Sequence, residues 1–151
     1  MAIPPFTAFG LLPEGTFDTD FGEIVGRYCE NPNRHGIWTN FIRFCAEELG
    51  HGRWSNRLFL DGGFTSDKPV TKDIDVIIDM TGFEVGVVFE AVTWQMANYE
   101  RLKAQYQVDF WVYHPQIPND LTAFFRYVKE EERLARGAPV DVRKGLLRVV
   151  I

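Results

Sequence analysis

The sequence contains few cysteines and no long apolar run, and each scarcity excludes a class of protein. Cys29 and Cys45 are its two cysteines, too few for a disulfide framework, which favours a reducing compartment. No segment approaches the roughly 18 apolar residues of a membrane span. The first six residues lack the charged start and unbroken apolar stretch of a signal peptide. We therefore expect a cytoplasmic protein without a membrane segment.

Positive charge is also scarce. With 16 Lys and Arg against 21 Asp and Glu, the formal charge is −5. Such a chain is a poor non-selective binder of nucleic acid, because phosphate is repelled overall. Basic side chains are nevertheless enriched before residue 60; they are Arg27, Arg34, His35, Arg43, His51, Arg53 and Arg57. We interpret them as a solvated helix face, and a local patch for nucleic acid is the alternative.

What the sequence does contain is material for a core. Hydrophobic residues make up 46% of the chain and aromatic residues 15%, which excludes a disordered chain. The length fits one domain over residues 1–151, and no repeat or linker divides it. Residues 1–32 carry four prolines and four glycines. We expect them to wrap irregularly against the core, with a short helix over residues 20–28.

Apolar periodicity predicts the remaining elements. Spacings of three and four predict helices over residues 33–49, with Asn33 as N-cap, and over residues 84–106. A third helix begins at Asn119 or Asp120 and ends in a charged stretch up to residue 136. Short apolar or alternating patterns predict strands over residues 57–60, 73–80, 108–113 and 145–151. This order indicates an α/β (α+β) fold with a small mixed sheet flanked by helices.

One segment, residues 60–76, combines a glycine turn with paired carboxylates. Gly62 and Gly63 follow a predicted strand, and glycines let a backbone turn tightly and approach an anion closely. Asp73 and Asp75 then stand two residues apart in the next strand, so both point to one face. Such neighbours repel one another, and Mg²⁺ is typically held by one or two carboxylates together with substrate phosphates. The segment therefore outlines a site for a nucleoside triphosphate and a divalent metal.

This pattern resembles the sequence motif of the nucleotidyltransferase superfamily, to which DNA polymerase β-like enzymes belong. That motif has an apolar position, Gly, Gly or Ser, a spacer, and then Asp-apolar-Asp-apolar; here nine residues separate Gly63 from Asp73. Over most of its length the chain is also similar to small single-domain bacterial proteins assigned to that superfamily, whose functions are uncharacterised. The segments that carry the similarity are Leu12-Pro13-Glu14-Gly15, Asn31-Pro32-Asn33-Arg34, Leu60-Asp61-Gly62-Gly63-Phe64 and Val108-Asp109-Phe110.

The resemblance implies a minimal nucleotidyltransferase fold with Mg²⁺ or Mn²⁺ as the metal and a nucleoside triphosphate as substrate. It implies that Asp73, Asp75 and Asp109 hold the metal, and that Asp109, the third carboxylate, also positions or deprotonates the attacking hydroxyl. An Asp in the otherwise apolar strand around Asp109 is costly unless it is paired or bound to metal. Two divalent ions bound at such a site stabilise the attacking and leaving oxygens of an in-line displacement.

The resemblance also assigns the glycine turn to the phosphates. Gly62 and Gly63 would approach them, but Gly63 stands where the family often has a serine. We therefore expect Thr65 or Ser66 to supply the hydroxyl. Lys68 would neutralise phosphate charge, or it is a solvated loop lysine, as we expect Lys72 to be.

Each candidate also has a structural interpretation. Asp73 and Asp75 could form an exposed, solubilising strand face, and Asp109 could cap a loop at a strand end. Asp61 is expected to fix the glycine turn, and Asp79 to lie beyond the site.

The three histidines share no metal-ligand spacing with the cysteines. His35 and His51 are expected at the surface. His114 follows the strand of Asp109 and could approach the site.

Three functions follow from these residues. The first is metal-dependent transfer of a nucleoside monophosphate from a triphosphate to a hydroxyl of a protein, an RNA end or a small molecule, within a toxin–antitoxin or defence pair by analogy. The second is a nucleotide-binding or protein-interaction module of the same fold with weak or no catalysis. The third is an RNA-binding or RNA-modifying toxin that uses the basic N-terminal half, against which the net charge counts.

Overall fold

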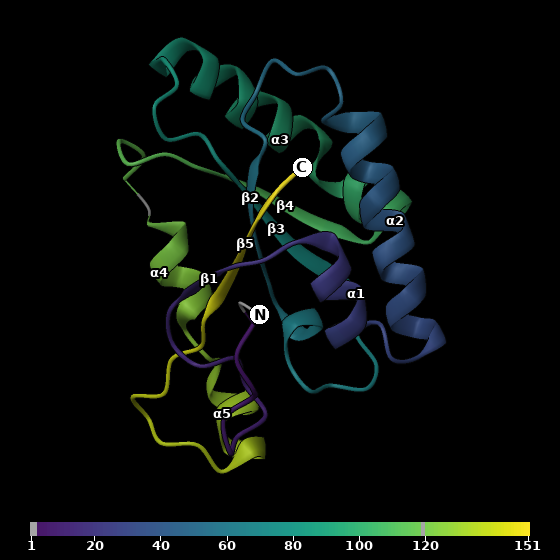
Figure 1. Cartoon of the computed structure of the whole chain (residues 1–151). Helices are drawn as coiled ribbons and strands as arrows, with labels where there is room; N and C mark the ends of the chain where they lie inside the picture. Colours follow the sequence, from purple (N-terminus) through teal and green to yellow (C-terminus); the bar gives the residue numbers. More distant parts are fainter. Residues whose placement is uncertain (1–2, 119) are drawn as a thin grey trace.

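The computed structural model describes residues 3–118 and 120–151 and confirms the mixed α/β fold. Its five-stranded sheet has the strand order β1-β5-β2-β3-β4 (Figure 1). The two outer pairs, β1–β5 and β3–β4, are parallel, whereas β2 runs antiparallel to both β5 and β3. The strands are β1 (Thr16–Asp18), β2 (Arg57–Asp61), β3 (Ile74–Asp79), β4 (Val108–Tyr113) and β5 (Leu146–Val150).

Helices cover both faces of this sheet. In Figure 1, α2 and α4 lie on opposite sides of the strands. None of the helices in the described ranges combines the length and apolar character that a bilayer crossing demands. The helices are α1 (Phe21–Tyr28), α2 (Pro32–Glu48), α3 (Val85–Tyr106), α4 (Leu121–Arg126) and α5 (Glu130–Arg136), and a short 3₁₀ turn, η1, spans Gly63–Thr65.

The start of α2 corrects one prediction. Asn31, not Asn33, is the N-cap, because its side chain accepts a hydrogen bond from the Arg34 N–H at 3.0 Å. Pro32 then occupies the first helical position, where its fixed φ and missing N–H cost nothing. Asn33 is left free to bind another segment, residues 62–71, which lie beside this end of α2.

Two further elements differ from the sequence prediction. The segment 1–32 contains a short strand, β1, in addition to the expected helix α1, which Asp20 caps. The predicted helix up to residue 136 is two helices, because Tyr127 is extended and pairs with Arg143. Asp120 caps α4 as expected, and the alternative cap Asn119 lies outside the described residues.

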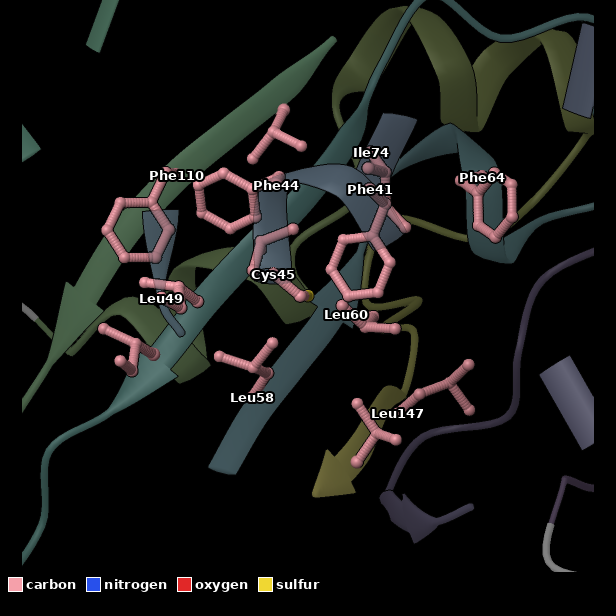
Figure 2. Close-up of a cluster of buried hydrophobic side chains, with 14 of the residues drawn as sticks. Phe41, Phe44, Cys45, Leu49, Leu58, Leu60, Phe64, Ile74, Phe110 and Leu147 are labelled. Atoms are coloured by element: carbon pink, nitrogen blue, oxygen red, sulfur yellow. The ribbon is translucent and has the colours of Figure 1, made fainter. Parts of the chain in front are cut away.

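The main core lies between the sheet and helices α1, α2 and α3. Strand residues at alternating positions point into it, and side chains of α2 interleave with them (Figure 2). Cys45 lies in this core as a small apolar side chain, and burial raises the pKa of its thiol to about 12. The strand residues shown there include Leu58, Leu60, Ile74, Phe110 and Leu147.

We call this side of the sheet the main face. The opposite side has a smaller apolar cluster, in which Phe59, Ile77 and Leu146 pack against Phe125 of α4. Because side chains alternate along a strand, every residue between two main-face residues points to this second side. The predicted carboxylates occupy such positions, so we call it the carboxylate face.

Candidate functional site

Three aspartates face one another across three neighbouring strands. Asp61 of β2 is registered with Asp75 of β3, and Asp75 is registered with Asp109 of β4. Adjacent strands are ~4.8 Å apart, so these side chains form a continuous carboxylate row. Asp73 precedes β3 by one residue and shares the parity of Asp75. The structure thus brings all three predicted carboxylates to one face, together with Asp61.

The carboxylate row is electrostatically costly. Burial raises the pKa of Asp75 well above its usual range, and the charges of Asp109, Asp61 and Asp73 add to this effect. Burial, and then the charge of Asp109, raises the pKa of Asp73. Burial also raises the pKa of Asp61 to about 6, although Lys144 opposes this. Acidic neighbours therefore destabilise the charged forms of Asp73 and Asp75, and carboxyl groups shifted in this way are typical of functional sites.

Several oxygens of the carboxylate row lack hydrogen bonds within the described part of the chain. Both oxygens of Asp61 and Oδ1 of Asp109 are buried without such a partner. Lys144 approaches Asp61 as an ion pair, with Nζ 3.4 Å from Oδ2. Burial, and then a hydrogen bond to Asp109, raises the pKa of Tyr99. Asp109 therefore has Tyr99 as a neighbour, and Asp61 has Lys144.

As the side chains are placed, no three His, Cys, Asp or Glu residues of the described ranges form a group that could hold a metal ion. The backbone positions of the aspartates do fit hard-cation chemistry, because the row supplies only oxygen donors and three of its oxygens are buried and unbonded.

The glycine turn lies directly against the carboxylate row. Gly62 has a φ of 89°, which other residues rarely adopt, and a Cβ there would lie 2.6 Å from Oδ2 of Asp75. Gly63 is less confined, since a Cβ would lie 3.3 Å from Cδ of Lys68, a flexible side chain. Gly62 thus has a steric reason, and the backbone reaches Asp75 because no side chain intervenes.

The predicted hydroxyls are engaged within the turn. Thr65 Oγ1 donates to the carbonyl of Gly62 at 3.2 Å, and Ser66 Oγ donates to that of Gly63 at 2.7 Å. Both side chains are buried. Lys68 lies beside Gly63, and its ammonium is 3.0 Å from Oε2 of Glu132 in α5. A phosphate would have to share or replace these partners.

Arg34 is the residue that the sequence interpretation misplaced. It is 1% exposed, not part of a solvated face. Its guanidinium donates to the carbonyls of Phe64 at 2.6 Å and Ser66 at 2.8 Å, and it also bonds those of Gly63 and Lys68. Arg34 is buried because these carbonyls satisfy its donors. A single side chain of α2 thereby fixes the shape of the turn.

Two asparagines extend this attachment. Asn31 donates to the carbonyl of Pro69 at 2.7 Å. Asn33 accepts from the N–H of Thr71 at 2.9 Å and donates to its carbonyl at 3.1 Å. The motif Asn31-Pro32-Asn33-Arg34 is thus a clamp on residues 62–71, which we call the glycine loop.

The other candidates lie away from the row. His114 is buried beyond the far end of β4, and its Nδ1 accepts from the Gln116 N–H at 3.1 Å, so it does not approach Asp109. Asp79 lies at the far end of β3, as expected, 3.7 Å from Arg57. His35, His51 and Lys72 are exposed, which confirms their assignment to the surface.

Comparisons with the curated proteins and with the solved structures found no match. The model of one protein family matches residues 4–150, which includes the glycine loop, the carboxylate row and the clamp. The match carries no activity, since the family is described as one of unknown function. The chain belongs to this family, DUF6932.

Proposed function

We propose that this protein is a metal-dependent nucleotidyltransferase, which moves a nucleoside monophosphate from a triphosphate to an acceptor hydroxyl and releases pyrophosphate. One observation carries the proposal: Asp75 faces Asp109 across β3 and β4, and Gly62 lies against the carboxylate of Asp75. A turn that brings backbone next to paired carboxylates is suited to a ligand that is both phosphorylated and metal-bound.

The residues would divide the work as follows. Asp73 and Asp75 would hold Mg²⁺ or Mn²⁺, which supplies charge stabilisation to the transferring phosphoryl group when bound. Asp109, which faces Asp75, would share the metal and would also orient the acceptor hydroxyl or take its proton. The unbonded Oδ1 of Asp109 leaves one acceptor for that role.

The glycine loop would bind the triphosphate. Gly62 and Gly63 would let the phosphates approach the backbone, with Thr65 and Ser66 as further partners. The Lys68 ammonium would leave Glu132 and bind a phosphate instead, since both groups offer anionic oxygen acceptors. We place this activity in the cytoplasm, with a hydroxyl of a protein partner, an RNA end or a small molecule as acceptor. A toxin–antitoxin or defence pair is the proposed setting.

Transfer of label tests this proposal. The purified protein is incubated with each α-labelled triphosphate, with Mg²⁺ or Mn²⁺, in host lysate. We expect label on a macromolecule or small acceptor, and its loss in Asp75→Asn and in Asp73→Ala/Asp75→Ala. Asp79→Asn is the matched control, because Asp79 lies in the same strand but pairs with Arg57. The proposal fails if no nucleotide gives transfer that depends on Asp75.

A second candidate is a binding module of the same fold, in which catalysis is weak or absent. The observation that favours it is an apolar stripe on α3, where Val85, Phe89 and Met96 are exposed at helical spacing. In that case nucleotide binding would be the same in Asp75→Asn as in the parent, or absent from both. Equilibrium binding of a fluorescent triphosphate, run beside the transfer assay, separates the two candidates.

A further inference from the structure

Asp61 is the most deeply buried member of the carboxylate row, and its burial needs an explanation. Its side chain is 0% exposed, and neither oxygen has a hydrogen bond within the described ranges. Burial raises the pKa of this carboxyl and outweighs the Lys144 ammonium and the backbone N–H of Gly62, which both lower it. Its register with Asp75 places it on the carboxylate face, beside the other aspartates.

Lys144 is the cation that balances Asp61. Its Nζ lies 3.4 Å from Oδ2, while the side chain retains 19% of its exposure. The backbone of this segment is anchored on two sides: the Lys144 N–H donates to the Arg126 carbonyl at 2.9 Å, and the Gly145 N–H donates to the Leu12 carbonyl at 3.1 Å. Lys144 therefore holds its ammonium beside the row, and its partial exposure gives that ammonium a route to water.

We propose that Asp61 is a metal-facing carboxylate of the row and that the Lys144 ammonium takes the place beside it that a divalent cation takes on binding. This inference rests on the proposed function, because it concerns the same metal. Lys144 and the cation then compete for one carboxylate. Departure of Lys144 into solvent would free Asp61 to complete, with Asp75 and Asp109, a set of oxygen donors on three adjacent strands.

A purely structural ion pair makes a different prediction. If Asp61 and Lys144 only stabilised the end of β2, neither would change the affinity for a metal, and each substitution would act on stability alone. Competition instead ties the effect of Lys144 to the presence of Asp61. The two side chains must therefore be changed singly and together.

The experiment is a titration of the full chain with Mn²⁺ alone at mildly alkaline pH, followed by electron paramagnetic resonance of the free ion. The variants are Asp61→Asn, Lys144→Met and their combination, with Asp75→Asn and Asp79→Asn beside them. Thermal unfolding is recorded for each. Lys144→Gln and Asp61→Ser replace any variant that does not fold.

We expect Asp61→Asn to weaken Mn²⁺ binding about tenfold or more and Lys144→Met to strengthen it. The gain from Lys144→Met should vanish when Asp61 is also replaced, and Asp79→Asn should bind like the parent. If Asp61→Asn binds like the parent while Asp75→Asn is weakened, the inference is overturned and the proposed function stands. If the parent binds no Mn²⁺, both the inference and the metal dependence of the proposed function are overturned.

Discussion

The two faces of the sheet differ in what their side chains do for the molecule. On the main face, alternating strand residues are fully buried against three helices and include no carboxylate. On the carboxylate face, the same three strands β2, β3 and β4 place aspartates opposite one another. The same three strands therefore contribute apolar packing on one face and repulsion between carboxylates on the other, because their side chains alternate between the two faces. The main face makes it possible to hold repelling charges on the other.

The largest predicted effect lies on the main face. Phe44 is fully buried, with its ring centroid 5.3 Å from that of Phe110. We expect Phe44→Ala to lower the free energy of unfolding by about 3–5 kcal/mol, because it leaves a cavity between α2 and the sheet. Urea unfolding measures this. Phe124→Ala, an exposed aromatic change on α4, is the control; an equal loss there would contradict the division between the faces.

Arg34→Met should have the next largest effect. The substitution keeps an unbranched apolar side chain but leaves several buried carbonyls without a donor, so we expect a loss of about 3 kcal/mol. Hydrogen exchange should also rise in residues 62–71, the glycine loop. Arg43→Met, an exposed change in the same helix, should cost ~1 kcal/mol or less. Unchanged exchange in the glycine loop would show that the clamp is not needed.

Gly62→Ala tests the contact between the glycine loop and the row. The left-handed φ and the clash with Asp75 together should cost about 1–3 kcal/mol. Gly52 also has a positive φ, but a Cβ at that position would meet nothing within 4 Å, so Gly52→Ala isolates the backbone cost. Thermal unfolding compares the two variants. Equal losses of stability would mean that the side chain of Asp75 moves aside without cost.

Asp75→Asn should stabilise the protein, whereas the substitutions above destabilise it. The folded state raises the pKa of this carboxyl, so stability falls as pH rises from the unfolded value of about 4 through the raised pKa. The substitution removes this penalty. It should raise the free energy of unfolding by about 1 kcal/mol at a pH above the raised pKa, and should leave it unchanged near about pH 4. Urea unfolding at the two pH values checks it. A destabilised Asp75→Asn at high pH would show that the row is structural.

Much of this architecture is visible in the sequence. The strands of residues 57–60 and 108–113 and the long helix α3 were predicted from apolar spacing, because each buries a regular face. Asp73 and Asp75 were placed on one face by strand parity, and Asp109 was assigned to them through the family resemblance. The register of β3 and β4 shows that Asp75 and Asp109 face one another.

The remainder depends on contacts between distant segments. β1 is only three residues long and is extended because it pairs with β5. The sequence of residues 16–18 alone does not indicate this pairing. The break between α4 and α5 occurs in residues that suit a helix, because Tyr127 pairs with Arg143 instead. Arg34 was assigned to the surface since its acceptors lie about 30 residues away in the chain. The ion pair of Asp61 was not predicted either, because Lys144 lies even further away in the chain.

The clamp of Asn31, Asn33 and Arg34 has a kinetic consequence. It orders the glycine loop during folding, so little conformational entropy of that segment is left to lose when a ligand arrives. Association should then proceed in a single phase whose rate rises in proportion to ligand concentration, without a slow step of loop ordering. Loosening the clamp should shorten the residence time of the bound ligand and introduce that step.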